Sequence, residues 1–100
     1  MTLGLSGKEL DAMILVFKQF SGIQEAILFG SRAMGTFKPG SDVDIALKGR
    51  ITIQDVASVK ALLEEESPLP YTFDVVDYHT LETLTLKEHV DRHGKSIYKS

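Results

Sequence analysis

The 100-residue sequence contains no cysteine and no tryptophan, and it has only three prolines. Without cysteine the chain forms no disulfide, no thiolate metal site and no cysteine nucleophile, as is common in intracellular proteins. No apolar run approaches the ~20 residues that cross a bilayer. No basic segment followed by an apolar one marks a signal peptide near the N-terminus. We therefore expect no membrane partner and a cytoplasmic location.

An excess of positive charge is also missing. The chain carries 11 Lys and Arg against 14 Asp and Glu, a formal net charge of −3, and its basic residues are scattered. Because affinity for DNA or RNA grows with the number of phosphates that basic side chains neutralise, we expect no general nucleic-acid binding. With 43% hydrophobic and 25% charged residues the composition is that of a globular protein. Residues 1–100 are predicted to form a single domain with a small core.

Three segments combine an N-capping residue with apolar residues at three- and four-residue spacing, the pattern of an amphipathic helix. They are residues 7–20 behind Ser6, residues 53–66 behind Thr52, and residues 81–92 behind Thr80. Short runs of β-branched and aromatic residues predict strands. These runs are residues 25–29, 43–47 and 71–76, while residues 97–98 either add an edge strand or pack on the core. The order of elements predicts a small α/β (α+β) fold, with a mixed sheet of three to four strands covered by helices.

Asp42 and Asp44 lie at the start of a predicted strand. Because successive side chains of a strand alternate between its faces, both carboxylates point to one side and Val43 points to the other. Two carboxylates on one face repel each other unless a cation lies between them, and hard oxygen ligands suit Mg²⁺. A lone Asp-x-Asp is more often an exposed polar face or a turn, so the pair gains weight only from its neighbours.

Gly30 and Ser31 follow the preceding predicted strand and open a loop that contains three glycines and a proline. Glycine lets a backbone approach a phosphate closely, and the N–H groups of a helical turn that begins near Ser31 form an anion site. The Ser31 hydroxyl adds one more donor. Arg32 and Lys38 are candidates for neutralising phosphate charge, although a solvated loop side chain is the more frequent role of either.

A third carboxylate is expected on the strand of residues 71–76, which offers Asp74 and, at its exit, Asp77. Being three residues apart, the two point to opposite faces, so only one can join Asp42 and Asp44. Asp74 is followed by two valines, and a charged group in such an apolar setting needs a partner. Asp77 is suited to a turn or a cap. We favour Asp74 and keep Asp77 as the alternative.

The combined pattern resembles the signature of the polymerase-β-like nucleotidyltransferase superfamily, which consists of Gly-Ser, ten residues, Asp-x-Asp, and a third acidic residue on a later strand. Gly30-Ser31, Asp42-Val43-Asp44 and Asp74 match it. The chain is similar to the minimal nucleotidyltransferases, small prokaryotic proteins made of little more than the catalytic core, and the likeness covers nearly its whole length. It departs at Met34, where members commonly have a basic residue that contacts phosphate.

The resemblance implies a nucleotidyl transfer that depends on two Mg²⁺ ions, with a nucleoside triphosphate, expected to be ATP, as substrate. Asp42 and Asp44 would hold both ions, and Asp74 would hold the one at the attacking hydroxyl. Gly30 and Ser31 would bind the β- and γ-phosphates. The acceptor hydroxyl would attack the α-phosphate in line, and pyrophosphate would leave.

The minimal nucleotidyltransferases are commonly paired with a small all-helical HEPN-domain protein, a toxin with RNase activity. The resemblance therefore implies an antitoxin that binds such a partner and adenylylates one of its tyrosines. Two alternatives stay open. One is a catalytically idle module that binds nucleotide or a partner, and the other is a transferase that acts on a small hydroxylated molecule such as an aminoglycoside.

Three histidines and an acidic run invite other interpretations. His89 and His93 have the i, i+4 spacing of metal ligands on a predicted helix, but no carboxylate or cysteine set surrounds them or His79. We therefore predict that they lie on the helix surface. Residues 64–66, three glutamates in a row, are predicted to be a solvated helix end.

Overall fold

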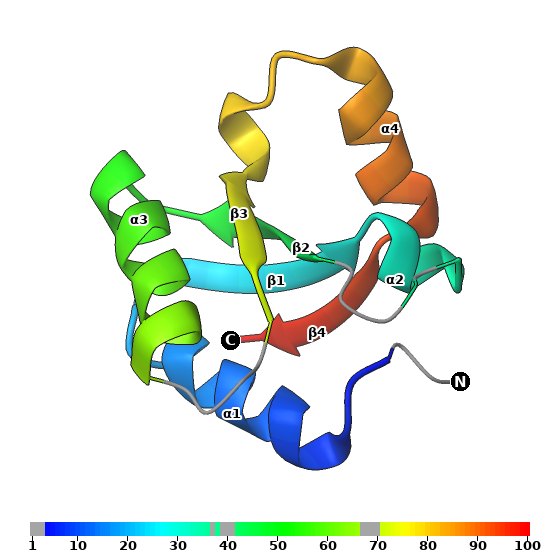
Figure 1. The fold of residues 1–100 in the computed structure, drawn as a ribbon. Helices are drawn as coiled ribbons and strands as arrows, with labels where there is room; N and C mark the ends of the chain where they lie inside the picture. The colour runs from blue at the N-terminus through cyan, green and yellow to red at the C-terminus, as the bar shows by residue number, and fades with distance from the viewer. Residues whose placement is uncertain (1–3, 37, 39–41, 67–70) are drawn as a thin grey trace.

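A computed structural model describes residues 4–36, 38, 42–66 and 71–100. Its strands are β1 (Ile23–Phe29), β2 (Val43–Gly49), β3 (Phe73–Asp77) and β4 (Lys95–Lys99). They form one sheet in the order β3-β2-β1-β4 (Figure 1). β1 runs antiparallel to β2 and to β4, whereas β2 and β3 are parallel. This mixed sheet of four strands confirms the predicted fold class.

The helices are α1 (Gly7–Phe17), α2 (Ser31–Met34), α3 (Ile53–Ala61) and α4 (Leu84–His93). A π-helical turn, η1 (Leu62–Glu66), continues α3, and a 3₁₀ turn, η2 (Tyr78–Thr80), follows β3. α3 supplies the crossover that two parallel neighbouring strands require. Within the described part of the chain, every helix is too short or too polar to cross a membrane.

The N-capping residues predicted at Ser6 and Thr52 are confirmed, and each is part of a capping box. The Ser6 hydroxyl accepts the Glu9 N–H at 3.1 Å, and the Glu9 carboxylate accepts the Ser6 N–H at 2.8 Å, which fixes the start of α1. Thr52 and Asp55 make the same reciprocal pair at the start of α3, at 3.1 and 2.9 Å. Four otherwise orphaned backbone donors are thereby satisfied at the two helix ends.

The predicted cap at Thr80 is wrong, because Thr80 ends the 3₁₀ turn and α4 begins four residues later at Leu84. Local hydrogen bonds explain the difference. The Asp77 carboxylate accepts the His79 N–H at 3.0 Å, and the Thr80 hydroxyl donates to the Asp77 carbonyl at 3.2 Å. Side chains that bond to a nearby backbone in this way stabilise a turn in place of a helix start.

The sheet has a different core on each face. The larger core lies under α1 and α3 and contains Met13, Phe17, Leu28, Ile45, Leu47, Val59 and Phe73. The smaller core lies under α4 and contains Ile27, Phe29, Ala46 and Val90. In Figure 1, α4 (orange) accordingly lies apart from α1 (blue) and α3 (green). Because side chains alternate along β2, the residues between those of the larger core face the α4 side.

Candidate active site

The three aspartates of the sequence motif gather on the face of the sheet that carries α4. The parallel register of β2 and β3 pairs Asp44 with Asp74, so the two side chains project from adjacent strands toward the same side. Asp42 precedes β2 by one residue, and its negative charge acts on Asp44. Asp44 is half-buried, whereas Asp42 and Asp74 are exposed.

Asp77 lies at the other end of β3, paired with Leu47, and strand alternation turns it to the opposite face. Its carboxylate caps the 3₁₀ turn through the His79 N–H. It also lines a small hollow of about 220 Å³ together with Ile53, Val56 and Thr80. The structure therefore places Asp74, and not Asp77, beside Asp42 and Asp44.

Electrostatics links the carboxylates of this group. The pKa of Asp44 is raised above its ordinary value, first by burial and then by the negative charges of Asp74 and Asp42. The positive charge of Arg32 acts in the opposite direction. The surroundings of Asp44 thus disfavour its charged form, and a bound cation would offset that effect.

These residues fit a Mg²⁺ ion that is shared with a substrate. Among the residues that the structure describes, no three His, Asp or Glu side chains are arranged to hold a metal ion on their own. Mg²⁺ is usually held by one or two carboxylates, while water and substrate phosphates fill its other positions. Asp42, Asp44 and Asp74 supply hard oxygen ligands of this kind on a face open to solvent.

Gly30 forms the turn that separates β1 from α2, and it lies directly against Asp44. Its φ of +77° and ψ of −154° belong to a region that is essentially restricted to glycine. A Cβ at this position would overlap the Asp44 Oδ2 atom. Ser31, half-buried, begins the four-residue helix α2 immediately after the turn. The structure therefore brings the Gly-Ser turn and the carboxylates together.

Arg32 is almost fully buried, at 3% exposure, although a loop side chain in solvent was the commoner expectation. Its Nη1 donates to the Gly4 carbonyl at 3.1 Å, and its guanidinium carbon lies 4.8 Å from the centre of the Tyr71 ring. Hydrogen bonding and the aromatic face offset the cost of burying the charge. The positive charge of Arg32 acts to lower the pKa of Asp44. A direct contact between Arg32 and a phosphate stays a prediction. Lys38 is exposed.

The sequence model of the family described as Polymerase beta, Nucleotidyltransferase matches residues 12–100. The chain belongs to this nucleotidyltransferase family. A search of curated proteins found no match.

Solved structures share the nucleotidyltransferase fold at low sequence identity. A toxin–antitoxin structure with AMP-PNP superposes with a TM-score of 0.76 and 23% identity, over 91% of this chain and 73% of that one. The complex of a tri-AMPylated HEPN toxin of Shewanella oneidensis with its MNT antitoxin gives 0.71 and 20%, over 93% and 71%. The toxin–antitoxin MntA-HepT gives 0.72 and 19%, over 95% and 74%.

His89 of this nucleotidyltransferase domain was expected on the helix surface, and that expectation is wrong. Its Nε2 accepts the Gly30 N–H at 2.9 Å, so this amide is occupied within the protein. Its ring packs edge-on against Phe29, with centroids 6.1 Å apart. The sequence held a signal, because His89 follows Leu86 by three residues and therefore lies on the apolar stripe of α4. His79 and His93 are exposed.

Glu64 was expected at a solvated helix end, and it is instead bound to the edge strand β3. Its Oε2 accepts the Phe73 N–H at 2.8 Å and a proton of the Lys60 ammonium at 2.8 Å. Glu64 lies in the π-helical turn η1, and a run of three glutamates gives no local sign of this contact with β3. Glu64 and Lys60 thereby anchor Phe73, the residue that directly precedes Asp74.

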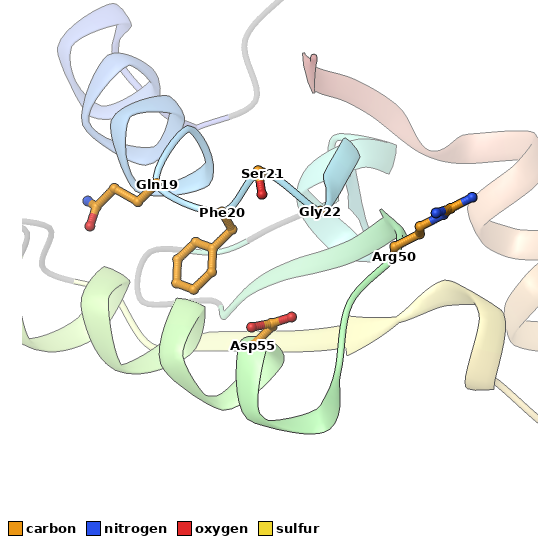
Figure 2. Close-up of a pocket in the computed structure, with 6 residues that line it drawn as sticks. All are labelled: Gln19, Phe20, Ser21, Gly22, Arg50 and Asp55. Atoms are coloured by element: carbon orange, nitrogen blue, oxygen red, sulfur yellow. The ribbon is translucent and has the colours of Figure 1, made fainter.

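A larger hollow of about 510 Å³ lies at the opposite ends of β1 and β2 from the carboxylates. Figure 2 shows Phe20 and Asp55 on either side of it, with Arg50 extending away. Its other lining residues are Gln19, Ser21 and Gly22. None of the predicted site residues lines it, so the family motif and this hollow are separate features.

Proposed function

We propose that this chain transfers a nucleoside monophosphate from a nucleoside triphosphate, with ATP as the expected donor, to a hydroxyl acceptor. The observation that carries the proposal is the register of β2 and β3, which sets Asp44 beside Asp74. The negative charge of Asp42 also acts on Asp44. The raised pKa of Asp44 is consistent with it, since a bound cation would offset the burial and the negative charges of Asp74 and Asp42 that raise it. Residues 1–100 would act as one domain.

Each residue of the site has a proposed role. Asp42 and Asp44 would hold both Mg²⁺ ions, and Asp74 would hold the one near the acceptor. The Ser31 amide and hydroxyl would bind the β- and γ-phosphates. When bound, Mg²⁺ neutralises the charge of the triphosphate and of the leaving pyrophosphate.

The transfer forms one bond and breaks one. The acceptor oxygen bonds to the α-phosphorus as the bond between that phosphorus and the bridging oxygen breaks, and pyrophosphate leaves. The acceptor proton passes to Asp74 or to water. Positioning by the aspartates and the Gly-Ser turn accounts for most of the rate, as is usual in phosphoryl and nucleotidyl transfer.

The acceptor we propose is a tyrosine of a small helical HEPN-domain toxin, which this chain would bind and neutralise as an antitoxin. Two of the similar structures support this proposal: the complex of an antitoxin with a tri-AMPylated HEPN toxin, and the toxin–antitoxin with AMP-PNP. The exposure of Asp42 and Asp74 also supports it, because a partner can reach that face of the sheet.

Labelled ATP, Mg²⁺ and the product of the neighbouring gene test the proposal directly. Label should appear on the partner, and it should vanish both with Asp42→Asn and on chelation of the metal. A partner that is bound but never labelled would leave the idle binding module as the function. Transfer of label to a small hydroxylated molecule in place of the partner would contradict the antitoxin role.

A further inference from the structure

We infer that His89 is a positioning residue for nucleotide binding: from α4 it holds the Gly30-Ser31 turn in place against Asp44. The inference rests on the proposed function, because it assigns the control of that same turn. The contact joins residues 59 positions apart in the sequence and is partly buried. Figure 1 shows α2, which begins at this turn, close to the C-terminal half of α4.

Two groups lie against the turn. The Asp44 carboxylate fills the space that a Gly30 side chain would need. The His89 Nε2 accepts the Gly30 N–H at 2.9 Å. A shift of Gly30 away from His89 would lengthen this hydrogen bond, and a shift toward Asp44 would crowd the Asp44 carboxylate. The position of Ser31, whose amide and hydroxyl are the proposed phosphate donors, is thereby set relative to the carboxylates.

The His89 ring is itself anchored. It stands edge-on to Phe29, the residue before Gly30, with an interplanar angle of 74°. Val90 beside it is 2% exposed and packs into the smaller core with Ile27, Phe29 and Ala46. Packing has already ordered the His89 ring. The ring therefore loses little further side-chain entropy when its Nε2 accepts the Gly30 N–H.

The hydrogen bond fixes the chemical state of His89. An imidazole nitrogen that accepts an N–H carries no proton, so the ring is neutral and its proton is on Nδ1. Because Nε2 is used by Gly30, that nitrogen is not a base for the acceptor hydroxyl. The neighbouring His93 ring, 5.4 Å away, does not turn the pair into a metal site, since no third ligand joins them within the described residues.

Two substitutions separate the hydrogen bond from the packing. His89→Phe keeps a ring against Phe29 and removes the acceptor, whereas His89→Gln restores an oxygen acceptor near the Nε2 position. His93→Phe, on the exposed face of the same helix, is the control. We expect His89→Phe to raise the KM and Kd for Mg-ATP about tenfold with little change in kcat, as for the loss of one buried hydrogen bond. His89→Gln should stay within about threefold, and His93→Phe should match wild type.

The melting temperature decides whether the effect is specific. The inference is overturned if His89→Phe binds Mg-ATP as tightly as wild type. It is also overturned if His89→Gln loses binding and melting temperature as fully as His89→Phe, because His89 would then be only a packing residue. Should His89→Phe fail to fold, His89→Leu takes its place as an apolar side chain without an acceptor.

Nuclear magnetic resonance of the chain without nucleotide gives an independent readout. The ring nitrogens of His89 should show the Nδ1–H tautomer, and Gly30 amide exchange should be slow in wild type and His89→Gln but at least tenfold faster in His89→Phe. Equal exchange in all three would overturn the inference whatever the chain transfers. If exchange responds as expected but the wild type binds no Mg-ATP, the proposed function fails and the nucleotide role of His89 fails with it.

Discussion

At the scale of single residues, Gly30 and Gly35 flank α2 with nearly the same φ, +77° and +76°. They differ in what a side chain would meet: a Cβ at Gly30 overlaps Asp44, while a Cβ at Gly35 has nothing within 4 Å. Gly35→Ala should therefore cost only backbone strain, about 1 kcal/mol, and keep activity. Gly30→Ala should cost roughly 1–3 kcal/mol and abolish nucleotide transfer because Asp44 is displaced. Chemical denaturation and a transfer assay on both variants check this, and equal activities would contradict it.

The placement of some of these residues could be inferred from the sequence, and that of others could not. Asp42 and Asp44 could be assigned to one face because strand alternation is a local rule. The choice of Asp74 over Asp77 also followed from alternation, and the register of β3 agrees with it. The contact between His89 and Gly30 could not be predicted, because it depends on how α4 crosses β1, which no local pattern encodes. The burial of Arg32 against Tyr71 escaped prediction for the same reason.

At the scale of elements, η1 and β3 are joined by Glu64, whose pKa is lowered by its hydrogen bonds from Lys60 and from the Phe73 N–H. A group whose folded pKa is depressed adds stability above its unfolded pKa, near 4.3, and that stability is lost as the pH falls through the folded value. Wild type should thus be more stable than Glu64→Gln at pH 7. The gap should begin to narrow below about pH 4.3 and close as the pH falls through the lowered folded pKa of Glu64.

Thermal melts of wild type, Glu64→Gln and the control Glu65→Gln across this pH range measure the effect. Glu65 is the exposed neighbour in the same π-helical turn, so its substitution should leave the pH profile unchanged. A gap between wild type and Glu64→Gln that is constant with pH would show that the carboxylate charge is not what anchors β3.

Element boundaries were predictable where side chains signal them. The capping boxes at Ser6 and Thr52 marked the starts of α1 and α3, because their hydrogen bonds span only three residues. Residues 97–98 were expected either to add an edge strand or to pack on the core, and β4 spans Lys95–Lys99. Pairing with β1 organises those extra residues, and such pairing is a long-range event that overrides weak local propensity.

At the scale of the whole molecule, the two faces of the sheet carry different features. α1 and α3 cover the larger core, while the face under α4 carries a smaller core and the three aspartates. Substitutions of the aspartates therefore leave the larger core untouched. The strand order β3-β2-β1-β4, and with it the meeting of Asp44 and Asp74, came from tertiary contacts that composition and periodicity do not specify.

The central claim is that this face assembles Asp42, Asp44 and Asp74 into one nucleotide-transfer site. Comparing the rates of labelled nucleotide transfer by Asp74→Asn and Asp77→Asn tests it most directly, since the two residues share β3 but face opposite sides. Asp74→Asn should transfer at least roughly 10²- to 10³-fold more slowly than wild type, because each ~1.4 kcal/mol of lost stabilisation is a factor of ten. Asp77→Asn should keep most of the activity and lose only stability at the 3₁₀ turn. The reverse order of rates would contradict the account.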